Sequence, residues 1–203
     1  MVAFFESVDG GGAAIALDEG EISVLRSLAT QMLELIGPGD EPDDGADPLA
    51  ALFAEGPSEP PRDPALARLF PDAYGDPAGG GEPDEESRRR SAEFRRFTEN
   101  ELRARKRGDL LAMISGLDAA ARDAGPDDGA GAAVLTLEPD DSRRWLGALN
   151  DLRLTLAARL GIEDESDSEK LFELSAGDPR KPLVIAYHWL GRLQDTLIET
   201  LLN

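Results

Sequence analysis

The sequence contains no cysteine and only one histidine, His188. The lack of cysteine excludes disulfides, thiolate metal sites and thiol chemistry. A single histidine cannot build a multi-histidine metal site, and it offers little for a catalytic triad. Because His188 lies inside an apolar helical stretch, we interpret it as a core or interface residue and not as a ligand.

Aromatic residues are also scarce, and long apolar runs are absent. Aromatics make up 5% of the chain and hydrophobic residues 41%, so the core must be built mainly from leucine, alanine, valine and isoleucine. No run reaches the roughly 18 apolar residues that a membrane span needs, and the first residues lack the basic and apolar regions of a signal peptide. We therefore expect a soluble, cytoplasmic protein that does not enter membranes.

The patterns that mark common enzyme classes are missing as well. The sequence has no GxGxxG, Walker or GxSxG pattern, and its two GGG runs, at 10–12 and 79–81, are typical of turns or linkers. Carboxylates are abundant, with 41 acidic residues, but no spacing singles out an acid–base pair or a calcium loop. We expect a protein that is not an enzyme and that uses neither a cofactor nor a metal.

The charged residues are unevenly distributed. The 41 acidic and 21 basic residues give a net charge of −20, and a chain this acidic is repelled by DNA and by anionic membranes. Nine of the 21 basic residues nevertheless fall within residues 87–107. Either this stretch pairs with the acidic remainder of its own chain, or it contacts nucleic acid or an acidic protein surface. The candidate partner-binding residues in it are Arg88, Arg89, Arg90, Arg95, Arg96, Arg103 and Lys106.

Hydrophobic spacing and capping residues predict the secondary structure. Strands are predicted at 2–8 and 13–17, joined by a glycine turn, and at 132–137. Long helices are predicted at about 19–36, 84–117, 138–160 and 182–202, short ones at about 63–70 and 167–175, and one or two further helical turns at 48–54. Gly108 interrupts the longest pattern, and a glycine costs about 1 kcal/mol inside a helix. One kinked helix and two separate helices both fit, and we favour one.

These elements predict an α+β fold that is predominantly helical. About four long helices pack around a small sheet made from the N-terminal hairpin and the strand near Val134. Residues 1–203 form a single domain, with flexible acidic segments rich in proline and glycine at about 39–62 and 75–83. The apolar surface of the last helix is wider than one face, so this helix is either central or at a subunit interface. If this helix lies at a subunit interface, the protein forms a homodimer through residues 182–202.

Three stretches together carry a resemblance to a known family: RDPALARLFPDAY at 62–74, FRRFTENELRARKR at 94–107 and WLGALNDLRLTLAARLGI at 145–162. In this order, behind an N-terminal hairpin and an acidic linker, they resemble the actinobacterial oxidative-stress regulator (AosR) family, formerly known only as a domain of unknown function. The resemblance implies a cytoplasmic, non-enzymatic transcriptional regulator that acts with a sigma factor of RNA polymerase. The matching residues are Arg96, Thr98, Leu102, Arg103, Lys106, Asn150, Asp151 and Arg153.

One property of that family does not transfer to this sequence. The redox response attributed to the family uses a cysteine pair, and this chain has none. We therefore predict a regulator that acts mainly through protein partners, without a disulfide switch and with weak direct DNA binding. The alternative is a general acidic adaptor with no promoter role. Five of the matching residues are expected to be structural: Thr98, Leu102, Asn150, Asp151 and Arg153.

Overall fold

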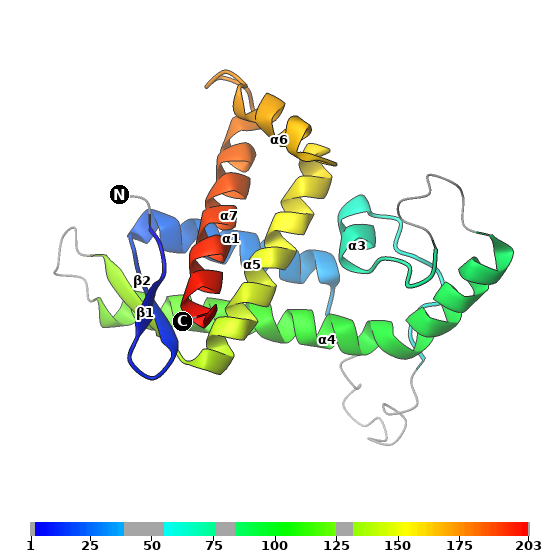
Figure 1. The fold of residues 1–203 in the computed structure, drawn as a ribbon, viewed down its shortest axis with the longest axis horizontal. Helices are drawn as coiled ribbons and strands as arrows, with labels where there is room; N and C mark the ends of the chain where they lie inside the picture. Colours follow the sequence, from blue (N-terminus) through cyan, green and yellow to red (C-terminus); the bar gives the residue numbers. More distant parts are fainter. Residues whose placement is uncertain (1–2, 39–54, 76–83, 125–131, 203) are drawn as a thin grey trace.

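The computed structural model describes residues 3–38, 55–75, 84–124 and 132–202 (Figure 1). These residues form the strands β1 (Glu6–Val8), β2 (Gly12–Leu17) and β3 (Ala133–Leu137), and the helices α1 (Glu19–Ile36), α3 (Pro64–Leu69), α4 (Glu85–Asp123), α5 (Pro139–Leu160), α6 (Glu165–Phe172) and α7 (Lys181–Leu202). The predicted α+β, predominantly helical fold is confirmed. The turns predicted at 48–54 and most of the predicted flexible segments lie outside the described residues.

The sheet is antiparallel, with strand order β1-β2-β3. Gly10 and Gly11 have φ values of 93° and 82°, a left-handed conformation that glycine adopts without strain, and they let β1 turn back into β2. Ile15 pairs with Leu135 in the register of β2 and β3. The predicted N-terminal hairpin and the strand near Val134 are therefore confirmed as parts of one sheet.

The core lies between one face of this sheet and the helices. Side chains alternate along a strand, and β2 accordingly buries Ala13, Ile15 and Leu17. Trp145 of α5 is 1% exposed and meets the Phe5 ring edge-on, with centroids 6.2 Å apart. The apolar residues at helical spacing in α1 are all buried: Ile22, Leu25, Ala29, Met32 and Ile36.

Helix α1 begins where its capping residues predict. The Asp18 carboxylate accepts a hydrogen bond from the Glu21 amide at 2.8 Å, and the Glu21 carboxylate accepts one from the Asp18 amide at 2.9 Å. This reciprocal capping box satisfies two amides that would otherwise lack partners at the helix end. The predicted bounds of 19–36 are confirmed.

Several predicted boundaries were wrong. Strand β1 begins at Glu6 and not at residue 2, and α6 ends at Phe172 and not at residue 175. Helix α4 is continuous through Gly108, as favoured, but it ends at Asp123 and not at Leu117. Alanine has the highest helix propensity, and the run at 119–121 continues the helix while Ala120 packs into the core, 4% exposed. Helix α6 begins at Glu165, two residues before the prediction, because Asp164 caps it by accepting a hydrogen bond from the Asp167 amide at 3.0 Å.

Helices α5 and α7 pack side by side and stand against α4 and the sheet (Figure 1). Helix α7 buries Val184, Leu190, Leu193 and Leu197 in this packing, so it takes part in the core, one of the two roles predicted for it. None of the described helices is long and apolar enough to cross a membrane.

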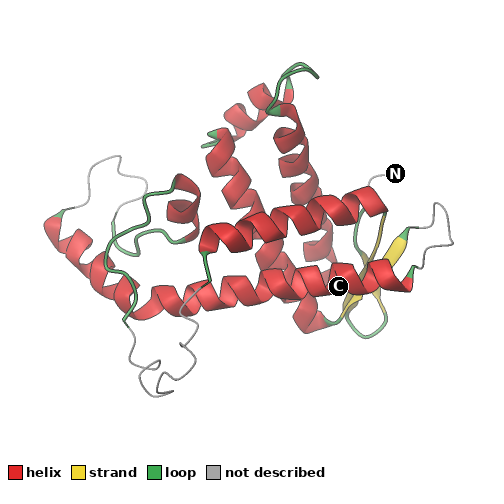
Figure 2. Cartoon of the chain, turned by 180° about the vertical axis from the view of Figure 1, so that it is seen from behind, coloured by secondary structure: helices red, strands yellow, loops and turns green. Residues whose placement is uncertain are grey.

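The N-terminal half of α4 extends beyond the α5–α7 pair, at the opposite end of the molecule from the sheet (Figures 1 and 2). Residues 55–75, which include α3, lie beside this half. Gly56 donates its amide hydrogen to the Arg96 carbonyl oxygen at 2.7 Å, and the cap of α3 is Asp63, which accepts from the Ala65 amide at 2.8 Å. We call residues 55–75 and 84–103 together the arm.

Candidate partner-binding surface on helix α4

In the arm, α4 buries polar side chains and exposes apolar ones. Ser91, Arg95 and Glu99 follow one another at intervals of one helical turn and are 2%, 4% and 1% exposed. Phe94 and Phe97 lie toward solvent, 45% and 66% exposed. A helix that only packs on a core has the opposite pattern. Apolar side chains grouped on an outer face indicate an interaction site.

The buried side is held by charges from several elements. The Glu99 carboxylate accepts hydrogen bonds from Arg95 and, at 2.7 and 2.9 Å, from Arg103. Arg95 also donates to Asp72 at 2.8 Å and to the Phe70 carbonyl oxygen at 3.0 Å. We call Asp72, Arg95, Glu99 and Arg103 the ionic cluster. It joins α4 to the segment that follows α3.

The ionic cluster also reaches the end of α1. Arg103 donates to the Ile36 carbonyl oxygen at 2.8 Å, and its guanidinium lies 4.5 Å from the centre of the Phe70 ring. Burial opposes the charged form of Arg95, but hydrogen bonds and attraction from Asp72 and Glu99 outweigh it and raise the pKa of Arg95 above its ordinary value. The charges inside the arm are therefore paired.

The exposed side combines aromatic rings with arginines. The Tyr74 and Phe94 rings meet edge-on with centroids 6.1 Å apart, and the guanidinium of Arg90 lies 5.3 Å from the Tyr74 centroid. Arg96 lies at the same distance, 5.3 Å, from the Phe97 ring. We call Tyr74, Arg90, Phe94, Arg96 and Phe97 the aromatic–arginine face.

Ser91 links the buried side of α4 to the aromatic–arginine face. Its buried hydroxyl donates to the Tyr74 carbonyl oxygen and accepts from the Tyr74 amide, both at 3.0 Å. These two bonds hold the Tyr74 backbone beside α4, next to the ring contact with Phe94. Together with Arg90, Glu93 and the two phenylalanines, Tyr74 lines a shallow hollow of about 300 Å³. This hollow can accept one large side chain of a partner.

The seven candidate residues of the basic stretch divide between the two interpretations. Arg95, Arg103 and Lys106 face inward and pair within the chain. The side chain of Arg96 is 42% exposed and pairs with Glu55 at 2.6 Å. The remaining three are exposed: Arg88, Arg89 and Arg90. Internal pairing thus accounts for the inward residues. Arg96 and Arg88, which lies 3.7 Å from Glu85, also pair within the chain, but they stay accessible to a partner, as do Arg89 and Arg90.

The matching residues on α5 pack against neighbouring helices. Asp151 accepts a hydrogen bond from Lys106 of α4 at 2.7 Å. The side chain of Gln194, on α7, accepts from Arg153 at 2.7 Å and donates to Asn150 at 3.4 Å. Asn150 is exposed, whereas Asp151 is 5% exposed and its counter-ion is Lys106 of α4.

The two other matching residues lie on α4. The Thr98 hydroxyl donates to the Phe94 carbonyl oxygen one turn earlier, at 2.8 Å, and Leu102 packs half-buried against the core. Among the described residues, no group of three or more histidine, aspartate or glutamate side chains could hold a metal ion.

A sequence-family model matches almost the whole chain. The match covers residues 1–201, and the family is described as a domain of unknown function (DUF2017). The chain belongs to this family. Its mycobacterial relatives carry the name that the resemblance predicted, and the predicted resemblance to the AosR family is thereby confirmed.

Three relatives give the extent of that similarity. The oxidative stress regulators AosR of Mycobacterium tuberculosis and Mycobacterium bovis are each 29% identical to this DUF2017 chain over 203 residues, which cover 98% of this chain and 86% of theirs. A putative oxidative stress regulator AosR of Mycobacterium leprae is 28% identical over 191 residues, which cover 90% of this chain and 79% of the relative. No solved structure matches the chain.

Sequence reasoning identified the basic stretch but not the aromatic–arginine face. Phe94, Phe97, Ala104 and Leu111 have helical spacing that is typical of one apolar side, yet this side faces solvent. The signal that could have revealed it is the spacing of Ser91, Arg95 and Glu99. Oppositely charged residues four apart, on the side away from the phenylalanines, are typical of a paired inner row.

The lack of cysteine leads to a direct prediction for this DUF2017 member. We expect diamide, which oxidises thiols, to leave its mass, circular dichroism and melting temperature unchanged. The buried Met32 and Met113, 2% and 0% exposed, require stronger oxidants, so hydrogen peroxide serves as the positive control. A mass or stability change with diamide alone would contradict the prediction.

Proposed function

We propose that this protein is a non-enzymatic regulator, and that it acts through a protein partner bound at the aromatic–arginine face of α4. The names of its mycobacterial relatives support a regulatory role. The observation that carries the proposal is the burial pattern of α4 in the arm: the charged Arg95 and Glu99 are buried, while the apolar Phe94 and Phe97 are exposed. Aromatic and arginine side chains dominate the binding energy of protein interfaces.

The resemblance to the AosR family suggests which partner to expect. By that resemblance the partner is a sigma factor or another subunit of RNA polymerase, and the two proteins bind in the cytoplasm. The rival proposal is a general adaptor with no promoter role. A homodimer through α7 is a further alternative, since Ile185 and Leu202 on that helix are 54% and 81% exposed.

Affinity capture from lysate, with the bound proteins identified by mass spectrometry, tests the proposal. The wild-type protein should enrich polymerase subunits. Phe97→Ser removes the most exposed ring of the face, and truncating such an interface residue costs about 2 kcal/mol or more, roughly thirtyfold in affinity. The enrichment should therefore fall at least tenfold.

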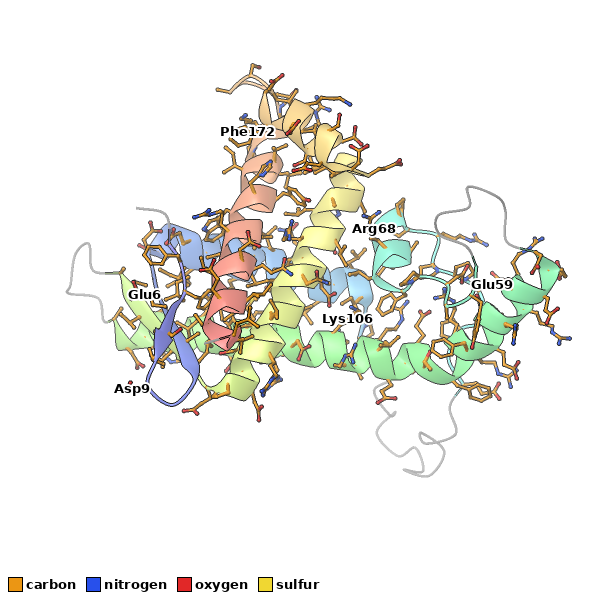
Figure 3. The ribbon with its side chains drawn as sticks, viewed as in Figure 1. Glu6, Asp9, Glu59, Arg68, Lys106 and Phe172 are labelled. Carbon is orange, nitrogen blue, oxygen red and sulfur yellow. The ribbon has the colours of Figure 1, made fainter. Side chains whose placement is uncertain are left out.

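Phe172→Ser is the matched control. Phe172 is also a half-exposed phenylalanine, 55% exposed, and it lies on α6, far from the arm (Figure 3). This variant should capture polymerase subunits as the wild type does. Equal loss in both variants would contradict the role of the face. Capture of proteolytic or metabolic proteins instead of polymerase subunits would favour the adaptor.

Direct DNA binding is expected to be weak. Arg88, Arg89 and Arg90 are exposed, but the chain carries a net charge of −20, and its carboxylates repel phosphates. In a gel-shift titration at about 150 mM salt, where the Debye length is about 8 Å, promoter and random duplexes should bind equally weakly. Any binding should fall steeply with added salt. Tight, sequence-selective binding that is lost when these three arginines become alanine would show that the stretch reads DNA.

A further inference from the structure

The outer face of the sheet has a groove. The sheet lies at the other end of the molecule from the arm (Figure 1). Ala14 and Ala16 of β2 form its floor. Val134, which pairs with Ala16 across the strands, lines one side, and Phe4 lies just before β1 on the other. The two small side chains between two large ones leave a hollow of about 500 Å³, a size typical of sites that bind one ligand or side-chain group.

The walls of this groove are apolar and accessible. Phe4 is 49% exposed and Val134 is 65% exposed, although the neighbouring residues Phe5 and Leu135 point to the core and are 4% and 6% exposed. The strand alternation that fills the core thus also places large apolar groups on the outer face. Exposed apolar side chains grouped around a hollow favour burial by a partner.

The charged residues that the structure describes in the groove are all acidic. Glu6, Asp18 and Glu21 line it, and none of the described lining residues is basic. The mutual capping bonds of Asp18 and Glu21, at 2.8 and 2.9 Å, hold two of these carboxylates in place at the start of α1. Complementary charge selects an interface partner and speeds its association. An apolar side chain flanked by lysine or arginine matches both the walls and the rim.

We propose that this groove binds a short basic–apolar segment of a partner protein. This site is independent of the aromatic–arginine face, because it lies at the opposite end of the molecule and has the opposite charge. A second copy of this chain is a weaker candidate, because the two copies would each bring a net charge of −20. The basic residues of the segment lie along the carboxylates of the groove, and its apolar side chain lies over the two alanines.

Two synthetic peptides, one of alternating lysine and leucine and one of alternating glutamate and leucine, test the charge requirement. Methyl NMR of the whole protein follows Ala14, Ala16 and Val134 during each titration. The lysine peptide should shift these methyl signals, and the glutamate peptide should not. Equal shifts with both peptides, or none with either, would overturn the proposal. Signals that depend on protein concentration without peptide would also overturn it and assign the groove to a second copy.

Three variants locate the binding. Ala16→Arg fills the floor with a bulky positive charge and should weaken lysine-peptide binding at least tenfold. Glu6→Gln removes one carboxylate of the groove and should weaken binding about threefold to fivefold. Asp9→Asn, in the hairpin turn outside the groove (Figure 3), should have no effect. Circular dichroism checks that each variant is folded. Unchanged binding in a folded Ala16→Arg variant would show that the peptide binds elsewhere.

Discussion

Replacing Glu99 with alanine is expected to lower the free energy of unfolding by about 3 to 5 kcal/mol. The Glu99 side chain is 2% exposed and is the shared partner of Arg95 and Arg103. Its removal leaves Arg95, 4% exposed, with one carboxylate partner, Asp72, and leaves Arg103 with none in the ionic cluster. Losing one member of a buried ion pair is costly because the remaining charge stays desolvated.

Urea denaturation followed by circular dichroism measures this loss. Glu101→Ala is the matched control, since Glu101 is an exposed glutamate two residues further along the same helix, and exposed substitutions usually change stability by less than about 0.5 kcal/mol. Because the ionic cluster holds the arm, protease cleavage within residues 55–75 should also become faster in Glu99→Ala. Equal stability of the two variants would mean that the cluster does not hold the arm.

Replacing Lys106 with alanine is expected to destabilise the protein by a similar amount, about 3 kcal/mol or more. Lys106 and Asp151 pair at 2.7 Å, with side chains that are 14% and 7% exposed. Burial raises the pKa of Asp151 above its ordinary value, and Lys106 opposes this rise. Without the lysine, a charged carboxylate remains buried between α4 and α5.

The pH dependence distinguishes this mechanism from a simple loss of packing. When a carboxyl group has a higher pKa in the folded state than in the unfolded state, folding gains stability as pH falls through the folded pKa, because the folded state binds the proton more tightly. In Lys106→Ala the pKa of Asp151 should rise further. The loss of unfolding free energy in Lys106→Ala, relative to the wild type, should therefore be largest at neutral pH and become smaller in mildly acidic solution.

A control variant and a double variant complete this test. Lys170→Ala removes an exposed lysine, 71% exposed and paired with Asp167 at 3.3 Å, and should change stability little. The double variant Lys106→Met with Asp151→Leu removes both charges and should recover most of the loss, because apolar replacement of a whole buried pair is often neutral. A destabilisation that persists in the double variant, and that does not depend on pH, would point to packing and not to charge.

Much of the fold could be predicted from the sequence because the signals are local. The capping box of Asp18 and Glu21, the glycine turn of the hairpin and the apolar stripe of α1 each need only a few neighbouring residues. The α+β class is confirmed for this reason, as are the predicted strands and helices that fall within the described residues, apart from some of their boundaries. The errors fell on the boundaries of β1, α4 and α6, where capping and tertiary packing compete.

The tertiary structure alone decided which side of α4 faces inward. Both sides of the basic stretch have helical spacing, and apolar spacing by itself favours Phe94 and Phe97 for the core. The partners of the opposite side come from distant positions: Arg95 contacts the Phe70 carbonyl oxygen, 25 residues away, and Arg103 that of Ile36, 67 residues away. Only the folded chain brings these groups together. A charged side chain becomes an inner residue when such partners offset its lost hydration, and the phenylalanines are left at the surface.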